Sequence, residues 1–314
     1  MIKSQLFCLF RKHTAALFLI FLMIILSKVL CLYLQSIEQF SPYLSDKGRE
    51  CYHLLLDESK GMSLEERTAF ISALQIDADT AEMHEAIGRY TSLLQGCYRV
   101  KGYIDYAKNG RGIIDMQIPH DLVSRKEFYA SLETPTVIDT DPFYRLLKLL
   151  TFDISPVWVM LLVGVFSADG YEKRVNRQID LCKRAKSYYL AHIGLCTAAA
   201  AIIYTLSFLA DMLISGAFRA EYFTAAFQST GLSGRLSVSV FGSIILLFIS
   251  GLFSVLLCVL VFELAARLIC SVKGYILFSV SFTGLMTALA YYIKPLLPFM
   301  FAALKDKGDL LAML

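Results

Sequence analysis

The sequence is poor in charged residues. Asp, Glu, Lys and Arg make up 18% of its 314 residues, whereas a soluble domain carries about 25%. Hydrophobic residues make up 56%, and the mean hydropathy is +0.57. This composition excludes a disordered chain, a collagen-like chain and the core of an ordinary water-soluble enzyme. With only seven prolines and 18 glycines, the chain is not a low-complexity linker either.

The sequence also lacks the short motifs that carry chemistry. It contains no GxxxxGK[ST] phosphate loop and no GxSxG, HExxH or DxDxG pattern. Its eight cysteines form no CxxC pair, and its five histidines have no ligand spacing. We therefore predict no catalytic residue, no cofactor and no metal site. Cys51 and Cys97 are the two cysteines of the polar middle region, and they can pair if that region lies outside the cell.

The apolar residues are concentrated in blocks long enough to cross a bilayer, which requires about 20 residues. The net charge of +3 is too small to indicate nucleic-acid binding, and the basic residues cluster beside the apolar blocks. We predict a mainly α, polytopic membrane protein with about five to six spans. The blocks are residues 14–33, 146–166, 188–209, 237–262 and 274–292.

Residues 35–145 form a different kind of sequence, polar and acidic, which predicts a small, mainly helical domain inserted between two spans. Ser63 with Glu66, and Ser124 with Glu127, have the spacing of a capping box. Asp79 is expected to cap a helix that ends at Gly96. Between residues 98 and 118, the Asn109-Gly110 pair predicts a turn joining two short strands. The remaining domains are the tail and first span, 1–34, and the membrane bundle, 146–314.

The basic residues predict the orientation of the spans. Lys3, Arg11 and Lys12 precede the first span, and six further basic residues fill the connection between the second and third. Since short basic connections stay in the cytoplasm, the N-terminus is expected inside and residues 35–145 outside the cell membrane. Five spans would leave the C-terminus outside, which suggests that a sixth span is missing from this chain.

Two polar residues inside predicted spans are candidates for a functional role. Asp153 lies in the second span, beside a Ser155-Pro156 pair that suggests a kink. An ionisable group within a bilayer is a functional hypothesis by default, but Asp153 also fits the outer headgroup layer if the span begins later. His192 in the third span is either a functional polar group or a satisfied side chain facing the interior of the bundle.

The connection at residues 168–187 is the most informative segment. It mixes three acids with six basic residues and has no helix breaker after Gly170. One interpretation is a solvated loop that sets the orientation. The other is a short amphipathic helix at the membrane surface that is offered to a cytoplasmic partner.

At this segment the sequence resembles the permease subunits of ABC-2-type exporters. Glu172-Lys173 matches the start of that family's pattern, residues 182–186 resemble its later basic element, and residues 139–143 resemble its acidic-aromatic approach to the second span. Arg174 and Ala185 stand where the family commonly has glycine. The resemblance implies a permease that dimerises with a second permease subunit and pairs with a separate ATPase subunit. It implies that the coupling residues are Glu172, Lys173, Arg174, Lys183, Arg184 and Lys186, with a second contact at residues 263–273.

A different class of function is also open. Residues 35–145 are long enough to be the working module of a membrane-anchored sensor or an envelope assembly protein. No expected cytoplasmic segment is long enough for a folded output domain, which argues against direct signalling and leaves an adaptor role.

Overall fold

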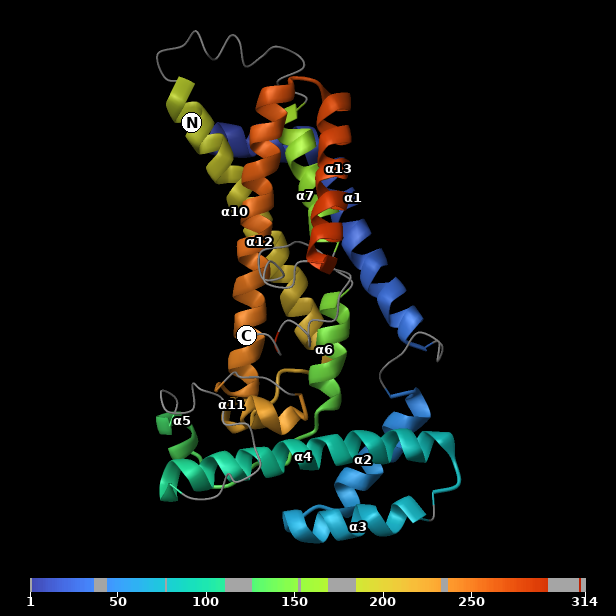
Figure 1. The fold of residues 1–314 in the computed structure, drawn as a ribbon. Coiled ribbons are helices and arrows are strands. Elements are labelled where there is room, and N and C mark those ends of the chain that lie inside the picture. The colour runs from blue at the N-terminus through green and yellow to red at the C-terminus, as the bar shows by residue number, and fades with distance from the viewer. Residues whose placement is uncertain are drawn as a thin grey trace. The chain divides into compact units, whose positions relative to one another are not determined.

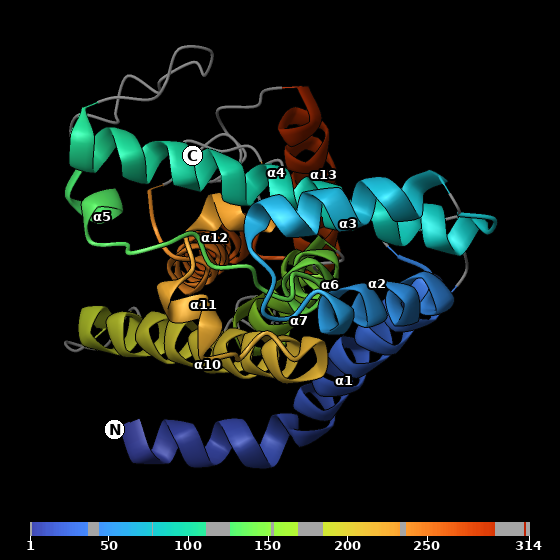
Figure 2. The same cartoon turned by 90° about the horizontal axis from the view of Figure 1, so that it is seen from below.

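The computed structural model describes residues 2–36, 44–76, 78–110, 126–151, 154–168, 185–232, 237–292 and 311. The described residues are mainly helical (Figures 1 and 2), and the one β-type contact among them is an isolated antiparallel bridge between Ala226 and Ser239. The α-helices are α1 (Ile2–Ser36), α2 (Asp46–Glu58), α3 (Leu64–Ile76), α4 (Ala81–Asn109), α5 (Lys126–Ala130), α6 (Asp141–Thr151), α7 (Ser155–Val163), α10 (Ala185–Ser215), α11 (Glu221–Thr224), α12 (Val240–Ile269) and α13 (Val272–Tyr292). A π-helical turn, η3 (Gly164–Ala168), follows α7, and a 3-10 turn, η4 (Phe227–Thr230), follows α11.

The chain divides into two compact units. Unit 1 comprises the described residues within 1–31, 149–211 and 248–306, and unit 2 those within 32–148, 212–247 and 307–314. Unit 2 therefore contains the polar middle region together with residues 212–247. From the sequence, we had assigned residues 212–247 to the connection between the third and fourth spans and to the start of the fourth span.

Two helices are long and apolar enough to cross a membrane. They are residues Ser187–Ser215 of α10 and the whole of α12, Val240–Ile269. The pair formed by α6 and α7 makes a third if it is one broken span, and Leu17–Cys31 and Val272–Leu285 are shorter apolar helices. Among the described residues the structure thus contains two or three such helices, as expected of a membrane protein. The larger number of spans and the insertion of residues 35–145 between spans stay predictions.

The break between α6 and α7 lies where the sequence predicted a kink. α6 ends at Thr151 and α7 begins at Ser155, with a proline in its first turn. A proline is well tolerated there, because the first backbone N–H groups of a helix have no intrahelical acceptor.

Unit 1 is built around α7, α10, α12 and α13. Figures 1 and 2 show α7, α12 and α13 running alongside one another. The hydroxyl group of Tyr275 in α13 donates to the carbonyl of Met160 in α7 at 2.8 Å. Tyr275 also lies against Gly164 in η3, where an added Cβ would come within 3.0 Å of its ring. These contacts fix the position of η3, which carries a residue of the site described below.

Unit 2 is built around α4, on which α2, α3, α5 and η4 pack (Figure 1). The capping box predicted at Ser63 is confirmed: the Ser63 backbone N–H donates to the Glu66 carboxylate at 2.7 Å, and the Glu66 N–H donates to the Ser63 hydroxyl at 3.2 Å. Ser124 lies outside the described residues. Cys51 and Cys97 are both free thiols in the structure.

The predicted helix end at Gly96 and the predicted strand before Asn109 are wrong. α4 continues through both positions to Asn109, and Thr80 rather than Asp79 caps its start, accepting from the Met83 N–H at 3.3 Å. A Cβ at Gly96 would overlap the carbonyl of Gln228, so this glycine allows η4 to approach the helix. Gly110, with φ of 63°, ends α4 by donating to the Tyr106 carbonyl at 2.9 Å. The turn signal was therefore a helix C-cap.

Candidate functional site

Most of the coupling residues that the resemblance implied lie outside the described residues. This applies to Glu172, Lys173, Arg174, Lys183 and Arg184, and also to Asp153. Lys186 lies in the first turn of α10, but its side chain is outside the described part of the structure. Among the predicted site residues, His192 alone has a side chain within the described part of the structure.

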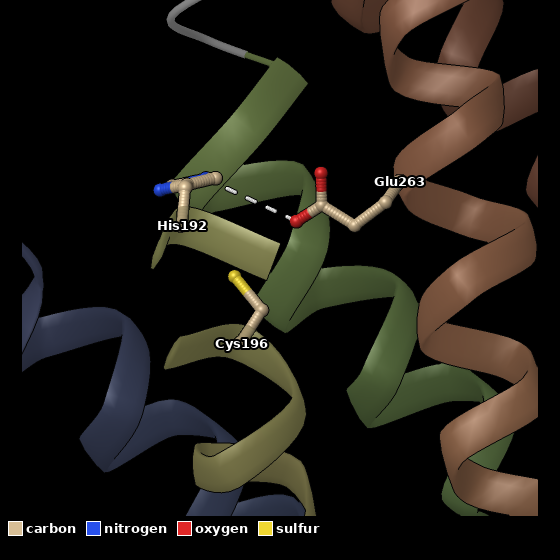
Figure 3. A group of neighbouring side chains, drawn as sticks. All are labelled: His192, Cys196 and Glu263. Atoms are coloured by element: carbon tan, nitrogen blue, oxygen red, sulfur yellow. Dashed lines mark ion pairs between the residues drawn. The ribbon is translucent and has the colours of Figure 1, made fainter. Parts of the chain in front are cut away.

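His192 belongs to a polar cluster formed by three elements of unit 1. His192 and Cys196 are four residues apart on α10, so they project from the same face of the helix. Glu263 comes from α12 and Ser167 from η3. Figure 3 shows the His192 and Cys196 side chains on one side and the Glu263 carboxylate directed toward them from the other.

The Ser167 hydroxyl connects the cluster. Its oxygen lies 2.6 Å from Oε1 of Glu263, to which it donates, and 2.9 Å from Nε2 of His192. The His192 Nε2 and Glu263 Oε1 atoms are 3.9 Å apart. One ligand-type atom each from His192, Cys196 and Glu263 lies within 4.8 Å of the other two. Nitrogen, sulfur and carboxylate oxygen donors therefore converge on one small volume.

The cluster is largely enclosed by protein. Cys196 is 1% exposed and Glu263 is 5% exposed, whereas the His192 side chain is 16% exposed. The ring of Tyr188 stacks on the His192 ring at a centroid distance of 6.1 Å and an interplanar angle of 5°. A buried carboxylate requires polar partners, and here Glu263 accepts a hydrogen bond from Ser167 and lies 3.9 Å from the His192 imidazole.

This cluster corrects one expectation from the sequence. Glu263 was expected in the connection after the fourth span, at the start of the second partner contact, but α12 continues to Ile269 and buries it. Cys196 lies in the predicted third span, 188–209, and the sequence assigned it no role. A helical wheel would have placed Cys196 and His192 on the same face of the helix, but no feature of the sequence indicates that Glu263 lies beside them.

A second polar pair in unit 1 was also not predicted. Lys28 of α1 lies within the first predicted span, 14–33. Its Nζ atom lies 2.7 Å from Oδ2 of Asp211 in α10, which is 1% exposed. Asp211 follows the predicted third span by two residues, so hydropathy alone had placed it outside.

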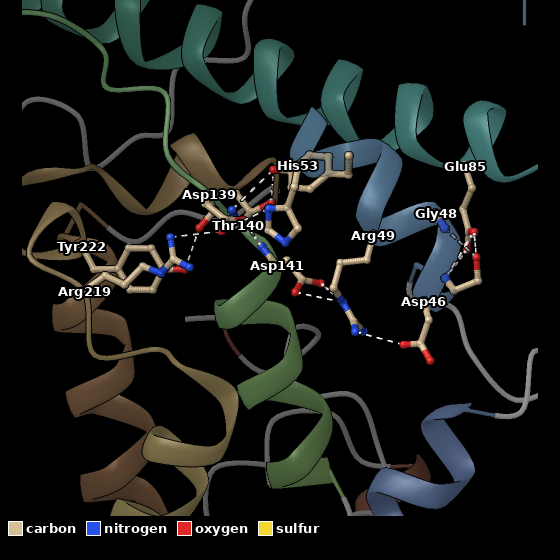
Figure 4. A network of polar contacts seen from close by, with 12 residues as sticks. Asp46, Gly48, Arg49, His53, Glu85, Asp139, Thr140, Asp141, Arg219 and Tyr222 are labelled. Atoms are coloured by element: carbon tan, nitrogen blue, oxygen red, sulfur yellow. Dashed lines mark hydrogen bonds and ion pairs between the residues drawn. The ribbon is translucent and has the colours of Figure 1, made fainter. Parts of the chain in front are cut away.

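Unit 2 carries a polar network centred on Asp139 (Figure 4). Arg219 and His53 approach its carboxylate from either side, with nitrogen to oxygen distances of 3.0 and 3.7 Å. The Tyr222 hydroxyl donates to the Asp139 carbonyl at 2.7 Å, and Arg49 pairs with Asp141 at 3.1 Å. The network thus joins α2, the segment before α6 and the segment around α11.

Burial raises the pKa of the Asp139 carboxyl above its ordinary range, although the Arg219 guanidinium lowers it. Phe143, from the acidic-aromatic segment, is fully buried against Tyr222 and Phe227. This segment therefore has a packing role within unit 2, and that role explains its acidic and aromatic residues without invoking a bound ligand.

No family model, curated protein or solved structure matches the chain. The description of function therefore depends on the residues themselves and on the resemblance stated above.

Proposed function

We propose that the chain is the transmembrane permease subunit of an ABC-type exporter, multi-pass in the cell membrane. The observation that carries the proposal is the order of its segments. A polar, basic segment at residues 168–187, with Glu172-Lys173 near its start, follows α7 and runs into the first turn of α10, and residues 32–148 precede it. Because the sequence contains no phosphate loop, ATP binding and hydrolysis belong to a separate ATPase subunit in this proposal.

In this proposal the chain has five or six spans, with the N-terminus in the cytoplasm and residues 35–145 outside. α1 and α13 are then spans as well, although their apolar parts, Leu17–Cys31 and Val272–Leu285, are short. Lys28 supports this assignment, since its pairing with Asp211 neutralises both charges within the apolar helices of unit 1. A second copy of the chain or a related permease completes the pathway.

The basic segment is the proposed contact with the ATPase. Charge reversal by Lys183→Glu and Arg184→Glu together is expected to weaken binding of the ATPase and uncouple hydrolysis from transport, since the basic side chains are proposed to meet the partner's surface. Membrane insertion should be unchanged. The measurement is the amount of ATPase that co-purifies with the tagged chain from detergent-solubilised membranes.

A matched control is the double reversal Lys47→Glu and Lys60→Glu, which changes two exposed lysines of unit 2. It changes the net charge by the same amount as the variant at residues 183 and 184, and it should leave the recovery of ATPase at the wild-type level. If the variant at residues 183 and 184 binds the ATPase and supports turnover as the wild type does, the coupling role is wrong.

A further inference from the structure

We infer that His192, Cys196 and Glu263 form a binding site for a divalent cation of borderline softness, with Zn²⁺ as the ion that fits best. Imidazole nitrogen, thiolate sulfur and carboxylate oxygen are the three donor types that zinc uses in proteins. The thiolate and imidazole together disfavour Mg²⁺ and Ca²⁺, which prefer oxygen ligands throughout. The inference does not depend on the permease proposal.

The geometry needs only a small contraction to hold the ion. Zinc ligands lie about 2.0–2.3 Å from the metal, which in a tetrahedral site separates neighbouring ligand atoms by roughly 3.3–3.8 Å. The His192 and Glu263 atoms are 3.9 Å apart, and all three ligand atoms lie within 4.8 Å of one another. A displacement of the ligand atoms by about 1 Å would therefore bring them to the separations that a zinc ion requires.

Ser167 is a positioning residue in this arrangement. Its hydroxyl donates to Oε1 of Glu263 at 2.6 Å, which orients the carboxylate and is the kind of outer contact that supports metal ligands. Three protein ligands leave the fourth position of a tetrahedral zinc ion for water or another small ligand. His192 is the most exposed of the three, with 16% of its side chain accessible.

The test is a Co²⁺ titration of the purified full-length chain in detergent after treatment with a chelator, followed by competition with Zn²⁺. Cobalt bound to a thiolate gives a charge-transfer absorption in the near ultraviolet, which reports on cysteine ligation directly. We expect one Co²⁺ per chain with this band, and its displacement by Zn²⁺. Cys196→Ser should abolish the band, and Glu263→Gln should weaken binding at least about tenfold.

The matched control is Cys258→Ser, which removes another buried cysteine of unit 1 from α12 and should leave the titration unchanged. Glu263→Gln keeps the shape of the side chain, so it tests the site even if Cys196→Ser fails to fold. The inference is overturned if no stoichiometric Co²⁺ binding occurs, if the band survives Cys196→Ser, or if Cys258→Ser weakens it equally. The ATPase is not present in the titration, so this result and that of the permease test are independent.

Discussion

At the scale of the residue, Gly251 shows how a glycine, which has no side chain, allows α10 and α12 to approach each other closely. A Cβ at this position of α12 would overlap the hydroxyl group of Tyr204 in α10, and the Tyr204 ring packs against those of Phe208 and Phe248. Small residues at helix contacts allow the close packing that drives association in membranes. Gly242, another glycine of α12, lies closest to Val238 and Ser239 of its own segment.

Gly251→Ala is therefore expected to lower the free energy of unfolding by about 1–2 kcal/mol, because the added methyl group forces Tyr204 aside in a packed contact. The measurement is thermal unfolding of the purified protein in detergent. Gly284→Ala in α13 is the control, since a Cβ there would meet no described atom within 4 Å. Equal melting temperatures for Gly251→Ala and the wild type would show that Tyr204 does not limit the approach of α10 and α12.

The same scale shows why the candidate site was only partly predictable. His192 was singled out because a polar group within an apolar run is conspicuous. Glu263 and Asp211 each follow the end of an apolar run, where hydropathy indicates the end of a span. Their burial depends on partners distant in sequence, Ser167 and Lys28, and a single sequence does not contain those pairings.

At the scale of the element, hydropathy correctly predicted the apolar helices, whereas the glycine signals gave the wrong end for α4. Long apolar runs are helical whatever surrounds them, because the bilayer offers the backbone no hydrogen-bond partners, and the predicted spans at 188–209 and 237–262 coincide with α10 and α12. Two glycines of this region have different roles. Gly96 allows a close contact within unit 2, and Gly110 caps the C-terminus of α4. The local sequence does not distinguish these roles.

The segment around α11 is held to the rest of unit 2 by the Arg219–Asp139 ion pair, and this pair predicts a dependence on pH. Burial raises the pKa of Asp139 in the folded state. The contribution of the Asp139 carboxyl to stability is therefore complete below its unfolded pKa of about 3.9, and it is lost as the pH rises through its folded pKa. Arg219 lowers the pKa of Asp139 and so opposes that loss.

Arg219→Met should therefore destabilise unit 2 little at about pH 4 and by about 1–2 kcal/mol at about pH 7. The cost is below that of a fully buried pair because the Arg219 side chain is 40% exposed and water screens it. The measurement is thermal unfolding at both pH values. Asp139→Asn in the same background should remove the difference between them, and a penalty independent of pH would contradict the assigned role of Asp139.

At the scale of the whole molecule, the chain divides into two compact units whose boundaries only partly follow the apolar and polar segments of the sequence. The boundaries 32–148 of unit 2 lie close to the polar region 35–145 seen in the sequence, but unit 2 also includes residues 212–247. The interaction of Arg219 and Tyr222 with Asp139 explains this addition. The sequence did not reveal it, because a short connection between apolar runs looks the same whether it is solvated or packed.

The proposed orientation places two native cysteines on opposite sides of the membrane. Cys51 lies in unit 2 and is half-buried, and Cys270 is exposed between α12 and α13. A maleimide that does not cross membranes should modify Cys51 in intact cells and Cys270 only after the membrane is opened. Cys97 should stay unmodified in the folded protein, because it is buried and burial raises the pKa of its thiol to about 12.

The individual sites of modification are located by mass spectrometry, with Cys51→Ser and Cys270→Ser as matched controls. Modification of Cys51 and Cys270 together in intact cells, or of Cys270 alone, would contradict the orientation inferred from the basic residues.

The most direct test of the central claim is purification of the tagged chain from native membranes in a mild detergent. The co-purifying proteins are then identified and assayed for ATP hydrolysis. The permease proposal predicts recovery of a separate ATPase with a phosphate loop, at a fixed ratio to the chain, and hydrolysis by the complex. Recovery of envelope or scaffold proteins alone, with no ATPase, would contradict the proposal and direct attention to unit 2 as the working part of the molecule.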